Sequence, residues 1–239
     1  MGSLGRRYPI SRPYHMFQHE LHGFYLHSEV EWNGSNSAKR QYLYPRVSPS
    51  ADSVALEAIP QALWFFLPAY LANPMAVLFG GGKPIDLGRS LSDGERILGD
   101  GKTWRGLIGG TASGALLGLL LSLPVNAFAP TSSWSFGSPA VALGASAVLA
   151  FGALLGDLAG AFLKRRMHRP RGAKAPGLDQ YDFVVGALLA SLAFPSWSVP
   201  RFFSGDALVG LLAIIVITPA LHRAVNLLGY RMGKKHEPW

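Results

Sequence analysis

The feature that most constrains this chain is a series of long apolar runs separated by shorter polar segments. The runs cover approximately residues 56–79, 104–123, 139–163, 183–194 and 207–228. Crossing about 30 Å of hydrocarbon takes roughly 17 to 25 helical residues, and every run except the fourth has this length. The fourth run must therefore recruit flanking residues. The pattern predicts an all-α, polytopic integral membrane protein with about five transmembrane helices.

The composition agrees with a membrane protein and excludes several kinds of site. With 49% hydrophobic and 15% charged residues, the chain is too apolar for an ordinary soluble domain. The absence of cysteine excludes disulfides, thiolate zinc sites, iron–sulfur clusters and a cysteine nucleophile. A net charge of +8 by itself fits nucleic acid or anionic lipid. Because the basic residues lie between apolar runs, we expect lipid headgroups and phosphate-bearing substrates as partners, and no nucleic acid.

The first 53 residues differ from the rest of the chain. They are polar, contain four of the seven histidines and lack a sustained helical period. They also lack the basic, then apolar, then small-residue layout of a secretory signal. We therefore expect a polar N-terminal tail over residues 1–53 and one transmembrane domain over residues 54–239. The tail is either non-native, with the true start near Val54 or Leu56, or disordered.

Lysine and arginine alternate in their placement between the apolar runs. They are concentrated in residues 80–103, 164–174 and 231–235, whereas residues 124–137 carry no charge and residues 195–205 carry only Arg201. Basic residues mark the cytoplasmic connections of membrane proteins. The pattern predicts a multi-pass protein of the cell membrane, with two functional loops and the C-terminus in the cytoplasm and with the active site on that side.

The first basic loop combines glycines with charges of both signs. Glycine lets backbone amides approach a phosphate, basic side chains neutralise it, and a helix that opens at Thr103 would point its positive end at the same anion. The spacing does not match a Walker A loop. A solvated connection between two helices is the alternative interpretation. The candidate substrate-binding residues here are Asp86, Asp93, Arg96, Lys102, Thr103 and Arg105.

A second candidate lies inside the third apolar run. Asp157 is surrounded by apolar residues, and Lys164 follows it two helical turns later, on the same helix face, with Arg165 next in sequence. An ionisable residue inside a membrane helix indicates function by default, because its burial is costly. A carboxylate with cations above it suits a metal-bound pyrophosphate. The alternative is a hydrogen-bond or salt-bridge partner on another helix.

A third candidate stands at the entrance to the fourth run. Asp179 and Asp182 are three residues apart and therefore share one helix face. Helix capping explains the first of them more readily than the second. Together with Asp157 they would offer three oxygen ligands of the kind that Mg²⁺ prefers. No histidine–carboxylate cluster indicates zinc or iron, and no Gly-x-Ser-x-Gly or Ser-His-Asp arrangement indicates acyl hydrolysis.

Several motifs in this order resemble those of one family over residues 56–239. They are Leu-Ala-Asn-Pro at 71–74, Pro-Ile-Asp-Leu-Gly at 84–88, Asp-Gly at 93–94, Gly-Asp-Gly-Lys-Thr-Trp-Arg-Gly at 99–106, Gly-Asp at 156–157, Lys-Arg-Arg at 164–166 and Asp-Gln-Tyr-Asp-Phe at 179–183. The chain resembles the CDP-archaeol synthases, the archaeal members of the CTP-dependent phosphatidate cytidylyltransferase group. The resemblance implies an integral membrane enzyme of phospholipid biosynthesis. It would transfer CMP from CTP to 2,3-bis-O-(geranylgeranyl)-sn-glycerol 1-phosphate, an isoprenoid ether lipid phosphate, and release pyrophosphate.

The motifs of the wider group can be placed on individual residues. Its Gly-Asp-x3-Ser-x2-Lys-Arg motif falls on residues 156–165, with Ala161 where serine is usual. Its Asp-x2-Asp pair falls on Asp179 and Asp182, and its Lys-Thr-x-x-Gly piece falls on residues 102–106. The departure at Ala161 puts in doubt any role for a hydroxyl at that position.

The residues and the resemblance together predict nucleotidyl transfer supported by Mg²⁺. The expected metal ligands are Asp157, Asp179 and Asp182; the expected catalytic set adds Lys102, Lys164 and Arg165, which would bind the phosphates of CTP and lipid. Asp86 and Asp93 could hold the nucleotide or a second metal. An ester-lipid phosphatidate cytidylyltransferase is the alternative within the same chemistry, and a non-enzymatic membrane subunit that binds anionic lipid is the alternative outside it. The sequence leaves open whether the chain forms a homodimer.

Overall fold

The computed structural model describes residues 51–169 and 175–233, together with four three-residue strands within residues 19–40. The chain divides into two units, Met1–Ser53 and Val54–Trp239. In the first unit, β1 (His19–Leu21) pairs antiparallel with β2 (Phe24–Leu26), and β3 (Val30–Trp32) pairs with β4 (Ala38–Arg40). These strands were not expected, because three residues are too few to show an alternating pattern. Residues 51–53 of the predicted tail begin the helix Ala51–Leu78, and the remaining residues of the tail lie outside the described ones.

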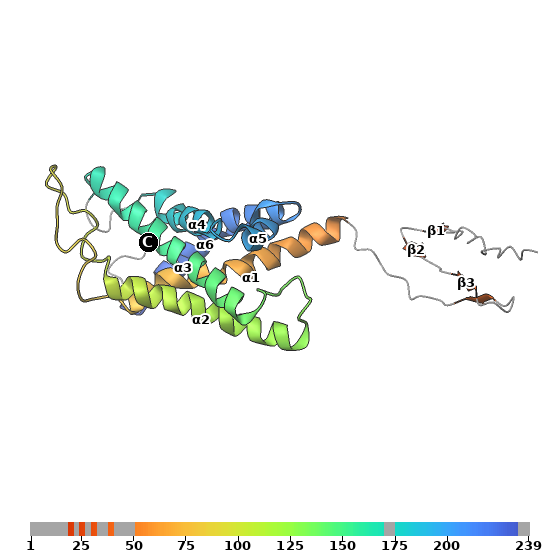
Figure 1. Cartoon of the computed structure of the whole chain (residues 1–239). Helices are drawn as coiled ribbons and strands as arrows, with labels where there is room; N and C mark the ends of the chain where they lie inside the picture. The colour runs from red at the N-terminus through yellow and green to blue at the C-terminus, as the bar shows by residue number, and fades with distance from the viewer. Residues whose placement is uncertain are drawn as a thin grey trace, which may run out of the picture. The chain divides into compact units, whose positions relative to one another are not determined.

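All regular elements among the described residues of the second unit are helices (Figure 1), and two isolated β-bridges, Pro84 with Thr103 and Ser90 with Arg96, lie within the first basic loop. Its long helices are α1 (Ala51–Leu78), α2 (Trp104–Phe128), α3 (Pro139–Arg166) and α6 (Ala207–Arg231). Between α3 and α6 lie α4 (Leu178–Ser191), α5 (Pro195–Ser198) and the π-helical η1 (Val199–Phe203). The four long helices are long and apolar enough to cross a bilayer. The prediction of an α-helical, multi-pass membrane protein is confirmed.

The fourth apolar segment is bent. Helix α4 and the α5–η1 segment are together long and apolar enough to cross a bilayer, but the chain bends by 115° between them. The bend falls just before Pro195, which begins α5. A proline disfavours the helical conformation in the residue that precedes it, so the chain turns here and does not continue α4. The expected recruitment of flanking residues therefore takes the form of a broken span or a re-entrant loop.

Helix α3 is the centre of the bundle, because glycines let both of its neighbours approach closely. A Cβ added to Gly118 of α2 would lie 1.7 Å from the hydroxyl of Ser146 on α3. A Cβ added to Gly186 of α4 would lie 2.3 Å from the Gly152 carbonyl of α3. Small residues at such crossings are typical of membrane helices, which associate mainly through close packing. The α3–α4 contact brings the two aspartate motifs of these helices together.

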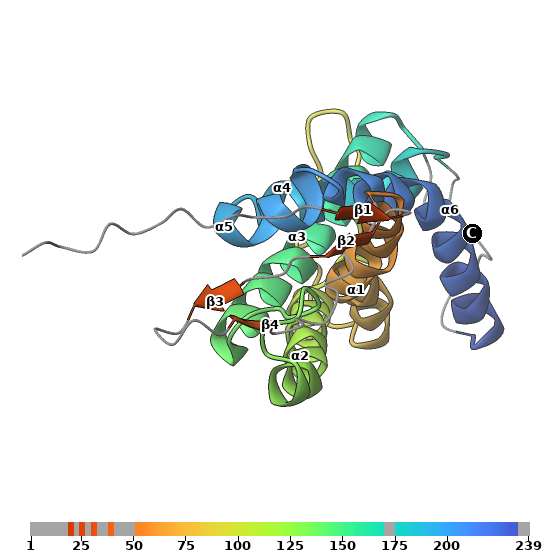
Figure 2. The same cartoon turned by 90° about the vertical axis from the view of Figure 1, so that its right-hand side faces the viewer.

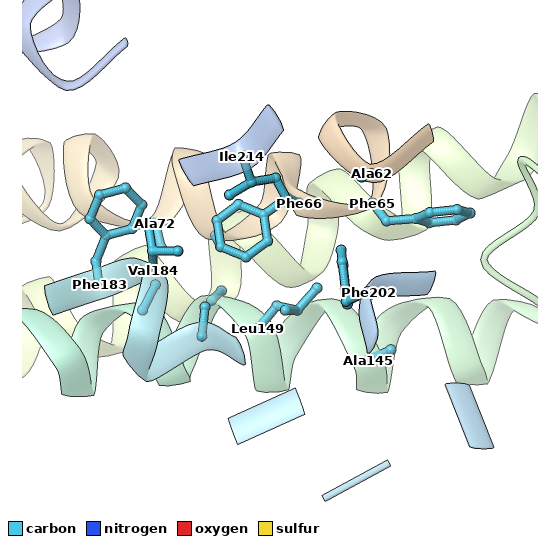
Figure 3. Packing of buried hydrophobic residues seen from close by; sticks show 14 of the residues in the cluster. Ala62, Phe65, Phe66, Ala72, Ala145, Leu149, Phe183, Val184, Phe202 and Ile214 are labelled. Carbon is cyan, nitrogen blue, oxygen red and sulfur yellow. The ribbon is translucent and has the colours of Figure 1, made fainter. Parts of the chain in front are cut away.

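Aromatic side chains fill the space between α1, α3 and the bent segment (Figure 3). Phe66 of α1 lies edge-on to Phe202 of η1, with 6.0 Å between the ring centroids. Ile214 of α6 and Leu149 of α3 are fully buried in the same cluster. Helix α6 packs less closely than the other long helices: 17% of its most apolar stretch is buried, compared with 33% to 44% for α1, α2 and α3. It lies at the margin of the bundle in Figure 2.

Candidate active site

The first basic loop is organised around the carboxylate of Asp86. This side chain has an exposed fraction of 0%. Its two oxygens accept bonds from Arg96 (2.7 and 3.2 Å) and from the backbone amides of Gly88, Leu98 and Gly99 (3.1, 3.0 and 2.9 Å). The Arg96 guanidinium first, and then these amides, hold the pKa of Asp86 well below its usual range. The predicted contact of Asp86 with substrate stays a prediction, and the bonds present here are internal to the loop.

The end of the loop passes directly into α2. Thr103 is the N-cap residue, and its hydroxyl accepts a bond from the Gly106 amide at 3.2 Å. The predicted opening of a helix at Thr103 is therefore confirmed. The preceding residue, Lys102, is held by a 2.8 Å bond from the Ile85 amide to its carbonyl. Its side chain then extends across to α3.

Two ammonium–carboxylate pairs bring the predicted catalytic residues together. Lys102 of the loop pairs with Asp157 of α3, and Lys164 at the end of α3 pairs with Asp179 of α4 at 2.6 Å. The four side chains are between 25% and 30% exposed. Lys164 lies on the α3 face predicted for it, but its partner is Asp179 and not Asp157. Asp182 of α4 interacts electrostatically with Asp157 and with both lysines.

Two glycines of α3 make room for Asp182. A Cβ added to Gly160 would lie 2.1 Å from an Asp182 carboxylate oxygen, and one added to Gly156 would lie 2.0 Å from the Asp182 carbonyl. Both distances are far below contact distance, so a side chain at 156 would overlap the α4 backbone and one at 160 would displace the Asp182 carboxylate. Gly160 was not among the predicted site residues. The Gly-x3-Gly spacing that it forms with Gly156 is the sequence signal for such a close helix contact.

The donor set fits a magnesium ion in part. Asp157 and Asp182 are hard oxygen donors on two adjacent helices, and Mg²⁺ in nucleotide sites often takes one or two carboxylates together with water and phosphate oxygens. Asp179 accepts bonds from Lys164 and from the Ala175 amide. Among the described residues, no three His, Asp or Glu side chains come close enough to hold a metal together. The three-carboxylate site therefore stays a prediction, and the pair Asp157–Asp182 is the part of it that the fold brings together.

A cavity of about 440 Å³ opens beside Asp157. Lys102 and Asp157 lie at its polar end, and apolar side chains of α1, α2 and α6 line most of the rest. Tyr70 and Asn73 of α1 also line it, and the buried side-chain Oδ1 of Asn73 has no hydrogen-bond partner. The cavity joins the charged site to an apolar space within the bundle.

Arg165 is a further cation at this site. Its guanidinium lies beside Gly99 of the loop, where an added Cβ would be 3.6 Å from the Nη2 atom. Its Nη1 atom donates to the Arg169 carbonyl at 2.9 Å. Within the described part of the chain, no carboxylate pairs with Arg165. A guanidinium in this position is suited to bind a phosphate.

Comparison with known proteins identifies the family. The model of the CarS-like CDP-archaeol synthase family matches residues 55–239. The chain belongs to the CDP-archaeol synthase family. It is 46% identical to the CDP-archaeol synthase of Natronomonas pharaonis over 194 residues, which cover 77% of this chain and 98% of the relative. It is 50% identical to that of Halobacterium salinarum over 181 residues, 74% of this chain and 95% of the relative.

A solved structure is also similar to this CDP-archaeol synthase family member. It is described as an intramembrane enzyme for archaeal membrane lipids biosynthesis. The two chains are 39% identical, with a TM-score of 0.49, over 66% of this chain and 93% of the solved one. The family suggested by the sequence motifs is thus confirmed by the family model and by the relatives.

One prominent residue of this family member was missed by the sequence reasoning. Arg166, in the last turn of α3, donates to the Asp93 carboxylate at 2.5 Å and to the carbonyls of Glu95 and Arg96 at 3.2 and 2.7 Å. Asp93 and Arg96 were expected to bind substrate, and here they also serve as partners of Arg166. In sequence, Arg166 is one of three consecutive cations, so nothing distinguished it from its neighbours.

Proposed function

We propose that this chain synthesises CDP-archaeol by transferring CMP from CTP to 2,3-bis-O-(geranylgeranyl)-sn-glycerol 1-phosphate. The observation that carries the proposal is the Lys102–Asp157 pair at the polar end of an apolar cavity. This arrangement places charge for a nucleotide beside space for isoprenoid chains. Membership of the CDP-archaeol synthase family supports the same reaction.

In this reaction, an oxygen of the lipid phosphate attacks the α-phosphorus of CTP. A bond forms between them, the bond from the α-phosphorus to the bridging oxygen breaks, and pyrophosphate leaves with that electron pair. Lys102, Lys164 and Arg165 would bind the phosphates and neutralise the charge that develops on the leaving group. Thr103 and Arg105 follow Lys102 at the start of α2 and would be additional phosphate contacts. Most of the rate gain would come from holding two anions in line.

In the structure, Lys102 neutralises Asp157 and Lys164 neutralises Asp179. When substrate binds, each lysine would leave its carboxylate and pair with a phosphate. Asp157 and Asp182 would hold Mg²⁺, with Asp179 as a third ligand once Lys164 turns to substrate. When bound, the ion would neutralise phosphate oxygens and help orient them for the displacement. Removal of Mg²⁺ should therefore abolish product formation.

The proposed orientation places the charged end of the bundle in the cytoplasm. The basic loop and the last turns of α3 and α6 gather cations at the end where Lys102 and Lys164 lie, and such ends face the cytoplasm. CTP would then arrive from water, while the lipid tails stay between α1 and α6. The C-terminus would lie on the same side.

The test is CDP-lipid formation by purified protein from labelled CTP. The unsaturated ether phosphate and a diacyl phosphatidate are offered side by side, each with Mg²⁺ or with EDTA. We expect Mg²⁺-dependent product from the ether lipid. Product from the diacyl lipid alone would favour the ester-lipid cytidylyltransferase, and no product from either lipid in folded protein would favour the non-enzymatic subunit.

A further inference from the structure

We propose that Arg166 is a positioning residue that fastens the first basic loop to α3, so that Lys102 is held at the reaction centre. The proposal rests on the proposed function, because it assigns Lys102 to the substrate phosphates. Arg166 itself would touch neither CTP nor lipid. In Figures 1 and 2, the loop of residues 80–103 lies beside the C-terminal end of α3.

Both terminal nitrogens of Arg166 donate hydrogen bonds to the loop. Residues 89–97 form a hairpin, in which the Ile97 amide donates to the Arg89 carbonyl and the Leu91 amide to the Glu95 carbonyl. The Nη1 atom of Arg166 donates to the Asp93 carboxylate, and its Nη2 atom donates to the carbonyls of Glu95 and Arg96 in this hairpin. The guanidinium also lies over the Phe162 ring, 5.3 Å from its centroid, and the side chain is 22% exposed. The Nε atom is buried without a partner. An arginine used in this way is a fastening between two backbone segments, not a free phosphate ligand.

A continuous set of bonds leads from Arg166 to Lys102. The Arg96 carbonyl accepts from Arg166, and the Arg96 side chain binds Asp86. Asp86 in turn accepts from the Gly99 amide, and the Gly99 carbonyl accepts from the Lys102 amide at 3.2 Å. The loop is thereby attached to α3 at two places, at Arg166 through its hairpin and at Asp157 through Lys102.

The two attachments should support each other. A loop of this length loses considerable conformational entropy when its end is held in one place. Because hydrogen bonds hold its hairpin on α3, part of the loop is already ordered before substrate binds. Lys102 is then preorganised for the displacement. The adjacent cation, Arg165, has a different task, since it lies by Gly99 without a carboxylate partner among the described residues.

The kinetic test compares Arg166→Ala with Arg166→Lys and with Arg89→Ala. Arg89 is an exposed cation of the same loop; its backbone amide donates to the Asp86 carbonyl at 2.8 Å and its carbonyl accepts from the Ile97 amide at 3.1 Å, and neither bond involves its side chain. We expect the kcat for CDP-lipid formation to fall at least tenfold in Arg166→Ala, with the KM for CTP changed less than threefold. Arg166→Lys keeps the charge and should recover part of the loss. Arg89→Ala should stay within twofold of the unchanged protein.

A distance measurement separates positioning from a general loss of folding. The chain has no cysteine, so spin labels can be placed at Ser92→Cys and Met167→Cys without background. Both positions are exposed, one in the hairpin and one just after α3. We expect a narrow distance distribution in the unchanged protein and in Arg89→Ala, and a broad one in Arg166→Ala. Asp93→Asn, which alters the loop partner alone, should broaden it to a smaller extent and replaces Arg166→Ala if that variant does not fold.

The outcomes separate this inference from the proposed function. A narrow distribution in Arg166→Ala, or a broad one with unchanged kcat, would overturn the positioning role. A loss of activity without broadening would also contradict it and would assign Arg166 to substrate. If the unchanged protein makes no CDP-lipid, the proposed function fails, whereas the distance measurement still decides whether Arg166 holds the loop.

Discussion

At the scale of single residues, two lysine–carboxylate pairs supply much of the charge of the site. Asp157 lies within the apolar helix α3 and Asp179 in the first turn of α4, where an unpaired carboxylate would be costly. Lys102 and Lys164 neutralise them here. The same lysines would neutralise phosphates once substrate and metal bind, so neither Asp157 nor Asp179 is left unpaired before that. Asp86 is different, because its partners all belong to its own loop.

Replacement of Asp157 by asparagine should abolish most of the activity. The change removes a proposed metal ligand and the charge that places Lys102, so we expect kcat/KM to fall by about 10²- to 10³-fold, as for the loss of one group that stabilises a transition state. The measurement is initial rate of CDP-lipid formation. Asp206→Asn is the control, because Asp206 is an exposed carboxylate at the other end of the bundle. Equal rates for the two variants would refute the assignment.

The Asp86→Asn substitution should lower the thermal stability by an amount that does not depend on pH between about pH 5 and about pH 8. A carboxyl group whose pKa is lowered in the folded state stabilises the protein above its unfolded pKa of about 3.9, and that contribution is lost only as the pH falls through the lower, folded value. The measurement is the Tm of both proteins in detergent across this range. A difference that shrinks already at pH 5 would show that Arg96 and the loop amides do not hold the carboxylate.

At the scale of elements, the α3–α4 contact decides where the carboxylates meet. Gly152, Gly156 and Gly160 form one small-residue face of α3 against which α4 packs. The sequence predicted the helices, because their lengths and apolar composition depend on nearby residues. It did not predict which lysine pairs with which aspartate, since that choice depends on how α2, α3 and α4 pack.

Gly160→Ala should therefore disturb the site, whereas Gly144→Ala on the same helix should not. An alanine methyl at 160 would overlap the Asp182 carboxylate, while at 144 no atom lies within 4 Å of the added Cβ. We expect at least a tenfold loss of kcat and a lower Tm for Gly160→Ala. Gly144→Ala should keep its activity and gain up to about 1 kcal/mol from better helix propensity. Equal activity of the two variants would contradict this account of the packing.

At the scale of the whole molecule, helices from both ends of the chain enclose one cavity. Its walls come from α1, α2, α3, α4 and α6, and its polar end reaches the basic loop. The Tyr70 hydroxyl of α1 is hydrogen-bonded to Thr218 of α6 at 2.8 Å, which ties the first and last helices together. Such a space can hold lipid chains while the charged site stays in contact with water.

A bulky side chain in this cavity should weaken lipid binding without affecting nucleotide binding. Val225→Trp places an indole among the cavity-lining residues of α6, so we expect the KM for the ether lipid phosphate to rise about tenfold or more. Val216→Trp is the matched control, because Val216 lies on the same helix, is 75% exposed and does not line the cavity. CTP binding, measured by equilibrium titration, should be unchanged in both. A similar KM for the two variants would show that the lipid lies elsewhere.

The sequence by itself determined the membrane class, the approximate spans, the helix start at Thr103 and the family, because apolar run length, capping residues and motifs are properties of neighbouring residues. The tertiary structure alone decided the partner of Lys102, the attachment of Arg166 to the loop, the internal bonding of Asp86 and the 115° bend of the fourth segment. Lys102 and Asp157 are 55 residues apart. Pairings over such separations depend on how closely the helices approach. Here α2, α3 and α4 approach closely because glycines, which have no side chain, lie where they cross.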